Sequence, residues 1–240
     1  MNDYKIIELL CTSESDNIAL AEQLAASQGW KLKTILKKYG YYDLGIYNIK
    51  DFLKTTWDCY NKRLLNLTQL LPASLKKLNC YHNQLSGLPA ELPAQLKGLY
   101  CQNNKMVELP PQLPQKLQEL YCGFNQLTQL PENLPASLFY LDCMKNKLSS
   151  LPDNLPIFLG MLNCSNNQIT ALPAQLPDTL IELHFNNNQI EYLPEVLPAN
   201  LTTISCENNP IKNIAILEKD FFYKSGVWIH NKQNYQTNYE

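Results

Sequence analysis

The side chains best suited to chemistry in this chain are eight cysteines and three histidines. Seven of the cysteines recur at one phase of a 21-residue period: Cys59, Cys80, Cys101, Cys122, Cys143, Cys164 and Cys206. Phe185 fills the one position of this series that lacks a cysteine. A position that accepts either residue requires apolar volume rather than sulfur chemistry, and a spacing of 21 residues is not that of a metal-ligand set. We therefore expect buried, reduced thiols and a reducing compartment.

The three histidines, His82, His184 and His230, are widely separated in the sequence. In a stack of strands about 4.8 Å apart, His82 and His184 would lie roughly 24 Å from each other, too far to share a metal or a proton. The sequence also contains no phosphate-binding loop, nucleotide-binding glycine fingerprint, zinc-ligand spacing or serine nucleophile elbow. These observations argue against an enzyme, and we expect neither a cofactor nor a metal site.

An internal repeat of 21 residues organises most of the chain. The stretch from Leu75 to Ala94, LKKLNCYHNQLSGLPAELPA, contains every phase of the repeat. The same pattern returns in registers that begin at Leu96, Leu117, Leu138, Leu159, Leu180 and Leu201. A leucine-rich period of this length with an asparagine at one phase indicates a solenoid of stacked strand-and-turn units.

Each phase of the repeat predicts a place in the solenoid. Alternation along a strand turns Leu78 and Cys80 inward and leaves Lys77, Asn79 and Tyr81 on the opposite, concave face. An asparagine follows each strand and can bond the backbone groups that the turn leaves unpaired: Asn83, Asn104, Asn125, Asn146, Asn167, Asn188 and Asn209. All 15 prolines lie between positions 72 and 210, mostly as L-P-x-x-L-P, which predicts an extended, polyproline-like convex side without helices.

The pattern L-x-x-L-x-C-x-x-N-x-L-x-x-L-P-x-x-L-P resembles the short leucine-rich repeats of bacterial proteins, including secreted effectors whose repeats carry LPxxLP. This resemblance implies an α/β-type solenoid: a right-handed arc with a concave parallel β-sheet and extended convex segments. Some of these effectors also carry a C-terminal ubiquitin-ligase domain with a catalytic Cys-x-Asp motif. The residues after Ile214 contain no cysteine, so we expect no such domain here.

Sequence outside the repeats is expected to cap them. Residues 1–52 lack proline and repeats and predict helices near residues 3–10, 15–28 and 30–39, which form a helical N-terminal cap or an independent binding module. Residues 53–214 form about eight repeats, the first of them degenerate, with Lys62 where later repeats have asparagine. Residues 215–240 form a short C-terminal cap and tail, with a helix predicted as far as Gly226 and a covering strand after it.

Composition limits the expected cellular location of the protein and the classes of partner that it can bind. The net charge is −2 with 18% charged residues, so no strong field favours nucleic acid or an anionic membrane. No apolar run is long enough for a membrane helix, and the N-terminus lacks the features of a secretory signal. We expect a cytoplasmic monomer, with export by a route that needs no signal peptide as the alternative.

The remaining candidate for function is the concave surface. Tyrosine and methionine favour interface centres, and the predicted partner-binding residues are Tyr81, Tyr100, Tyr121, Tyr140, Phe124, Met144, Met161, Glu119 and Asp142. Gly98 and Gly123 could leave room there for a partner's side chain. The competing interpretation is that tyrosines merely suit strands and stack across them.

Three functions remain open from the sequence, beside a purely structural role with no specific partner. The first is a non-catalytic protein-interaction module whose concave face binds a protein of unknown identity. The second is a secreted bacterial effector that binds a host protein with the same surface. The third is an enzyme fragment, against which the missing catalytic constellations argue.

Overall fold

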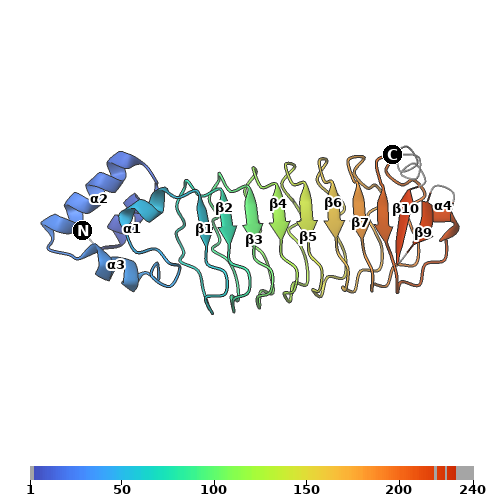
Figure 1. The fold of residues 1–240 in the computed structure, drawn as a ribbon, viewed down its shortest axis with the longest axis horizontal. Helices are drawn as coiled ribbons and strands as arrows, with labels where there is room; N and C mark the ends of the chain where they lie inside the picture. The colour runs from blue at the N-terminus through green and yellow to red at the C-terminus, as the bar shows by residue number, and fades with distance from the viewer. Residues whose placement is uncertain (1–2, 219–220, 225, 231–240) are drawn as a thin grey trace, which may run out of the picture.

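One short strand per repeat forms the body of the structure, a computed structural model that describes residues 3–218, 221–224 and 226–230. These parallel strands follow one another in chain order (Figure 1): β1 (Thr56–Asp58), β2 (Lys77–Asn79), β3 (Gly98–Tyr100), β4 (Glu119–Tyr121), β5 (Tyr140–Asp142), β6 (Met161–Asn163), β7 (Glu182–His184) and β8 (Thr203–Ser205). Pairing keeps the repeat phase, because Leu78 lies opposite Trp57 and Leu99. The predicted solenoid with its parallel sheet is confirmed.

The core of each repeat is built from the same phases. The middle residue of every strand is buried, as is the cysteine or Phe185 that follows it. All eight cysteines are free and buried, and burial raises the pKa of Cys101 to about 12. This agrees with the interpretation of the phased cysteines as apolar filling.

The asparagine ladder connects neighbouring repeats. Asn125 donates from Nδ2 to the carbonyl oxygens of Cys101 at 3.0 Å and Cys122 at 3.1 Å. Its Oδ1 accepts the backbone N–H of Met106 at 3.0 Å. The other six asparagines of this phase repeat these bonds, so the predicted ladder is confirmed. The residue before each asparagine has a positive φ, which makes the sharp turn that leaves the strand.

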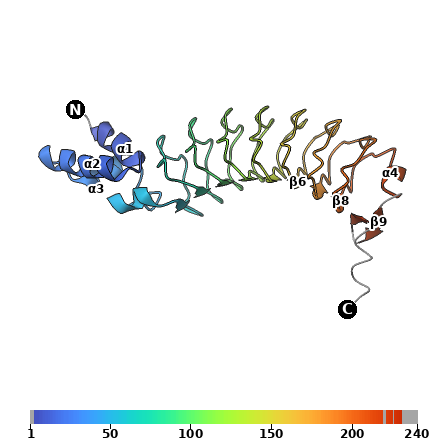
Figure 2. The ribbon, with the colours of Figure 1, turned by 90° about the horizontal axis from the view of Figure 1, so that it is seen from above.

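The strands and the loops lie on opposite sides of an arc. Viewed from above, the strands follow the concave edge and the proline-rich segments project from the convex edge (Figure 2). No helix occurs between residues 56 and 214, all of which the structure describes. Proline explains this, because it lacks the backbone donor that a helix interior needs.

Helices cover the first repeat. They are α1 (Asp3–Cys11), α2 (Ser15–Ser27) and α3 (Leu32–Lys38), followed by the 3₁₀ turn η1 (Ile49–Leu53). Tyr41, Phe52 and Trp57 form a buried aromatic cluster with ring centroids 5.1 to 6.2 Å apart. The backbone N–H of Ala73 also donates to the Cys11 carbonyl at 2.7 Å. The helical segment therefore closes the apolar end of the solenoid.

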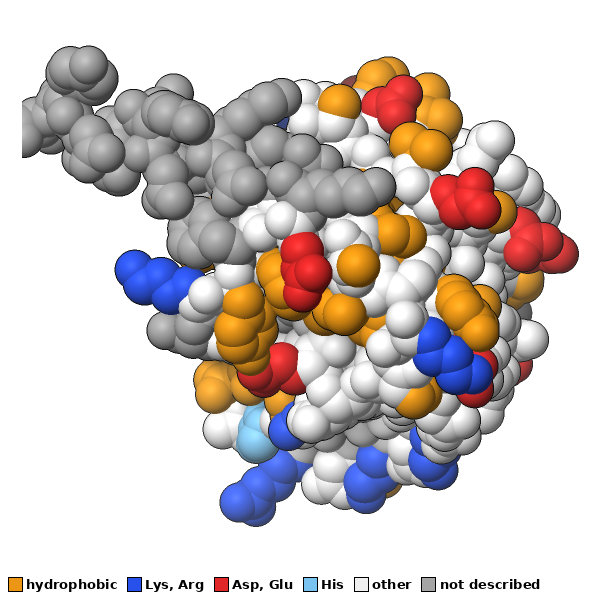
Figure 3. Space-filling model, turned by 90° about the vertical axis from the view of Figure 1, so that its right-hand side faces the viewer, with side chains coloured by type: hydrophobic (Ala, Val, Ile, Leu, Met, Phe, Trp, Pro, Cys, Tyr) orange, Lys and Arg blue, Asp and Glu red, His pale blue; other side chains and the backbone are white. Residues whose placement is uncertain are grey.

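The C-terminal end differs from the prediction of one helix as far as Gly226. Helix α4 spans only Ala215–Glu218, and the next segment is a strand, β9 (Phe221–Lys224), paired antiparallel with β10 (Val227–His230). Strand β10 pairs with β8, so the exposed edge of the sheet favours a hairpin over a helix. Viewed onto this end, hydrophobic side chains are interspersed with polar and charged ones (Figure 3). The predicted tail from residue 231 lies outside the described residues.

Across the described part of the chain, the helices are too short or too polar to span a membrane.

Candidate interaction surface

The concave face consists of three rows of side chains, named here by their place in the repeat. Row A is the first residue of each strand and includes Lys77, Gly98, Glu119, Tyr140, Met161 and Glu182. Row B is the last residue of each strand and includes Asp58, Asn79, Tyr100, Tyr121, Asp142, Asn163, His184 and Ser205. Row C follows the buried core residue and includes Tyr60, Tyr81, Gln102, Gly123, Met144, Ser165 and Glu207.

The four predicted tyrosines do not form one continuous stack. Tyr100 and Tyr121 stack in row B with centroids 5.3 Å apart and an interplanar angle of 16°. Tyr81 lies in row C and stacks with Tyr60 at the same distance and angle. Tyr140 lies in row A and meets the ring of Phe139 edge-on. Tyr60 is not among the predicted partner-binding residues, although it has the same phase in the repeat as Tyr81.

Tyr100 and Glu119 form the polar centre of the predicted site. The Tyr100 hydroxyl donates to Glu119 Oε2 across adjacent strands. Burial raises the pKa of Tyr100, and the Glu119 carboxylate raises it further by a smaller amount. The Lys77 ammonium lies 6.0 Å from the centroid of the Tyr100 ring, a cation–π distance. Lys77 is not among the predicted partner-binding residues. Its place in the strand, two residues before Asn79, was the only indication that it lies on the concave face.

The room expected beside Gly98 and Gly123 is already filled. A Cβ on Gly98 would lie 3.0 Å from Cε2 of Tyr100, because that ring leans over the glycine. A Cβ on Gly123 would lie 3.0 Å from the carbonyl oxygen of Met144 and 3.3 Å from Oδ1 of Asp142. The expectation of open room at these glycines was therefore wrong, since side-chain and backbone atoms of neighbouring residues already occupy it.

Asp142 ends β5, Met144 follows it by two residues, and Met161 begins the adjacent strand β6. Asp142 Oδ1 accepts the backbone N–H of Met144 at 3.0 Å. Burial raises the pKa of Asp142, and the bond from Met144 opposes this in part. Met161 pairs in register with Tyr140. All these side chains are half-buried and reachable from the concave side.

Phe124 lies at the rim of the concave face in a strained turn. Its φ is +54°, and its side chain is 43% exposed. In four other repeats the corresponding residue is asparagine: Asn103, Asn166, Asn187 and Asn208. Asparagine tolerates this conformation better than phenylalanine. The Lys145 ammonium lies 4.7 Å from the Phe124 ring centroid. A bulky aromatic retained at such a position is a candidate for function.

A serine, a histidine and a glutamate meet near the C-terminal end of the face. His184 Nδ1 lies 3.1 Å from Ser205 Oγ, and His184 Nε2 lies 3.3 Å from Glu182 Oε2. The sequence did not predict this contact, because it depends on the register between β7 and β8. Ser205 is only 4% exposed, so a substrate carbonyl cannot reach its Oγ. The trio holds the strands together and does not form a usable nucleophile.

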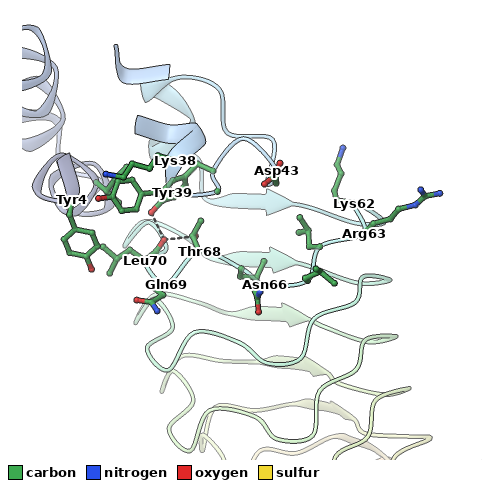
Figure 4. Close-up of a pocket in the computed structure, with 16 residues that line it drawn as sticks. Tyr4, Lys38, Tyr39, Asp43, Lys62, Arg63, Asn66, Thr68, Gln69 and Leu70 are labelled. Atoms are coloured by element: carbon green, nitrogen blue, oxygen red, sulfur yellow. Dashed lines mark hydrogen bonds between the residues drawn. The ribbon is translucent and has the colours of Figure 1, made fainter. Parts of the chain in front are cut away.

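A groove of about 770 Å³ lies between the N-terminal helices and the first repeat (Figure 4). Lys38 is committed to Asp3 at 2.5 Å, while Lys62 and Arg63 extend away from the groove. Thr68 Oγ1 donates to the Leu70 carbonyl at 3.0 Å. The polar groups of the groove therefore stabilise the junction between the N-terminal helices and the first repeat. Nowhere in the described ranges do three His, Cys, Asp or Glu side chains gather to hold a metal ion.

The repeated strand, asparagine turn and extended convex segment define a protein of the leucine-rich repeat class. The family model described as Leucine Rich Repeat matches residues 74–96, and the chain belongs to this family. No curated protein sequence matches it.

Solved bacterial structures share the fold. The leucine-rich repeat domain of a Shigella effector is 34% identical with a TM-score of 0.64, and the match covers 75% of this chain and 80% of that one. YopM from Yersinia enterocolitica is 36% identical with a TM-score of 0.63, covering 67% of this chain but only 35% of YopM. A leucine-rich repeat protein of Leptospira interrogans is 27% identical with a TM-score of 0.63, covering 67% and 45%. The chain thus spans about a third of YopM and under half of the Leptospira protein.

Proposed function

We propose that this chain is a non-catalytic protein-interaction module that binds a protein partner on its concave face. The observation that carries the proposal is the half-exposed group formed by the stacked pair Tyr100 and Tyr121 with Tyr140, Met144 and Met161. Such residues bury large areas on binding and retain polar or adaptable contacts. Glu119 fixes the Tyr100 hydroxyl, so this part of the surface is ordered before a partner arrives.

The sheet gives this surface the rigidity that an interface favours. Parallel pairing and the asparagine ladder hold each row of side chains at a constant spacing. A preorganised surface loses less conformational entropy on binding than a mobile one. Phe124 adds an exposed aromatic side chain at the rim, where it can extend the contact beyond the strands.

A second candidate has the same surface bind a host protein after export. The structural similarity to a domain described as a Shigella effector favours this alternative. It differs from the first candidate in the cell where the chain acts, and the residues that contact the partner are the same. Buried thiols along the core suit a reducing compartment, and the cytoplasm of either cell provides one. We propose a monomer in both cases.

The test is affinity capture from lysate with two folded chains and a folded control variant. One is the unmodified protein, and the other carries Tyr100→Ala, Tyr121→Ala and Tyr140→Ala. A control variant carries Val107→Ser and Val196→Ser, which alter exposed apolar residues of the convex side. A protein retained by the unmodified chain and the control but lost from the tyrosine variant supports the proposal. Equal retention by all three chains contradicts it.

An export assay separates the two destinations. The chain is produced in a bacterium with an active secretion apparatus and in the same strain with that apparatus deleted. Appearance of the chain in the medium only when the apparatus is active supports the effector alternative. Retention inside both strains favours the first candidate.

A further inference from the structure

Asp142 lies in the middle of the concave face, and among the described residues one hydrogen bond reaches its carboxylate. It lies in row B on β5, between Tyr121 of β4 and Asn163 of β6 in the register of the sheet. Its Oδ1 accepts the Met144 backbone N–H at 3.0 Å. The side chain is half-buried, so the carboxylate is partly removed from water without being closed off from the concave side.

Asp58 provides an internal comparison, because it has the same phase in the repeat. Asp58 Oδ1 accepts the backbone N–H of Tyr60 at 3.0 Å, as Asp142 does from Met144. Asp58 also accepts a second bond, from Nδ2 of Asn79 on the next strand at 3.1 Å. The residue equivalent to Asn79 beside Asp142 is Asn163.

Asn163 does not provide that second bond. Its Nδ2 is directed at the sulfur of Met144, 3.5 Å away. Its Oδ1 accepts the Ser165 N–H at 3.2 Å, as Asn79 accepts the N–H of Tyr81 at 3.1 Å. The two asparagines thus make the same turn but orient their amides differently. Asp142 consequently has one donor fewer than Asp58 despite being more buried.

A positive charge does not replace the missing donor. Lys38 lies 2.5 Å from Asp3 and Lys54 lies 2.7 Å from Asp51, whereas no cationic side chain of the described residues lies within ion-pair distance of Asp142. Burial raises the pKa of Asp142, opposed by the Met144 N–H and by His184. A half-buried carboxylate without a cation is costly in the free protein and favours a cationic partner.

The surrounding surface has the same charge preference. From β3 to β8, rows A to C contain the carboxylates of Glu119, Asp142, Glu182 and Glu207 and no lysine or arginine. Residues 106–218 as a whole contain eleven acidic and four basic residues. Opposite charges across an interface guide the partner's approach and select its orientation.

We infer that the concave surface receives a cationic side chain of its protein partner, a lysine or an arginine, at the carboxylate of Asp142. This inference rests on the proposed function and specifies the chemistry of the partner. The ammonium or guanidinium group supplies the donor that Asn163 withholds, and it lies beside the Tyr121 and Tyr140 rings, which attract cations through their faces. Asp142 is then the residue that selects a basic segment over a neutral one.

The experiment uses the full chain as bait for a displayed library of random linear peptides. Parallel selections use the unmodified chain, Asp142→Asn, Asp58→Asn and the variant with Tyr121→Ala and Tyr140→Ala. Asparagine keeps an Oδ1 acceptor for the Met144 N–H, so Asp142→Asn removes the charge while retaining the turn. Asp58→Asn makes the same chemical change at the same phase of the repeat. Circular dichroism and the unfolding midpoint establish that each bait is folded.

The expected result is enrichment of peptides that contain lysine or arginine on the unmodified chain and on Asp58→Asn. Synthetic versions of these peptides should bind Asp142→Asn at least about tenfold more weakly, because loss of one partner of a desolvated charge pair is costly. Replacing the peptide's cation with glutamine should produce a similar loss. When the peptide without its cation is measured against the Asp142→Asn variant, its binding should be little weaker than that of the original peptide.

Two other results overturn the inference in distinguishable ways. Peptides that bind Asp142→Asn as well as the unmodified chain, but not the tyrosine variant, leave the concave site intact and exclude the role of Asp142. Enrichment of peptides that all four baits bind equally, or of none, overturns the inference together with the proposed concave site.

Discussion

The side-chain amide of Asn125 donates to the carbonyl of Cys101 in the preceding repeat at 3.0 Å while accepting the N–H of Met106 at 3.0 Å. The same amide also donates to the Cys122 carbonyl of its own repeat at 3.1 Å, so one side chain satisfies backbone groups of two repeats. The bond crosses the boundary between repeats, and a solenoid depends on such contacts because no repeat is stable alone. The first prediction follows from this relationship.

Asn125→Ala should lower the free energy of unfolding by about 1 to 3 kcal/mol or more, because it leaves buried backbone groups without partners. Urea unfolding followed by circular dichroism measures the change. Asn133→Ala, at an exposed convex position, is the matched control and should have little effect. An unchanged midpoint for Asn125→Ala would contradict the structural role of the ladder.

Gly160 should accept a side chain only if the Phe139 ring moves. A Cβ at Gly160 would lie 2.3 Å from Cζ of Phe139. Gly160→Ala should therefore destabilise the chain by about 1 to 3 kcal/mol, as expected for overpacking. In the background Phe139→Ala the same substitution should cost much less, and this coupling is measured by a double-mutant cycle. Gly87→Ala, where a Cβ meets nothing within 4 Å, is the control; equal costs in both backgrounds would refute the packing.

Phe124→Asn should stabilise the chain and weaken binding of its partner. Asparagine suits the φ of +54° better than phenylalanine, which favours the variant by about 0.5 to 1 kcal/mol after loss of the Lys145 contact. The unfolding midpoint and the capture assay measure the two effects. Arg63→Asn, at a position with a φ of +58°, serves as the control for the backbone effect. A stabilised variant that captures the same partner equally well would exclude Phe124 from the site.

Stability should fall as the solution becomes alkaline. Burial raises the pKa of the Cys101 thiol to about 12 from its ordinary value of 9.0, so above pH 9 the unfolded chain loses a proton that the folded chain keeps. Each such thiol then reduces the free energy of unfolding by about 1.4 kcal/mol per pH unit, until the folded pKa is reached. Below pH 9 this contribution to stability is fully present.

Denaturant unfolding between pH 7 and pH 10 measures this slope. Cys101→Ala should have a shallower slope, because it lacks one of the titrating thiols. Thiol reagents at neutral pH should label the phased cysteines only as fast as the chain opens. Rapid labelling of most of them, or stability that stays constant to pH 10, would show that the thiols are not buried as the structure has them.

The sequence alone determined the repeated architecture. Leu78, Cys80 and Asn83 recur every 21 residues, and each copy has the same neighbours in the stack. A residue's phase therefore determines whether it lies in the core, in the ladder or on the concave face, without knowledge of the tertiary contacts. The same logic extended to the convex side, where proline excludes helices.

The tertiary structure decided what periodicity does not encode. The stacking of Tyr100 with Tyr121, the filled space at Gly98 and Gly123, and the orientation of Asn163 depend on rotamers chosen among residues that differ from repeat to repeat. The hairpin β9–β10 likewise depends on the free edge of β8, which offers backbone hydrogen bonds that local helix propensity cannot match. Position along the solenoid follows from a repeated pattern, whereas the chemistry of the surface follows from the particular neighbours that each side chain meets.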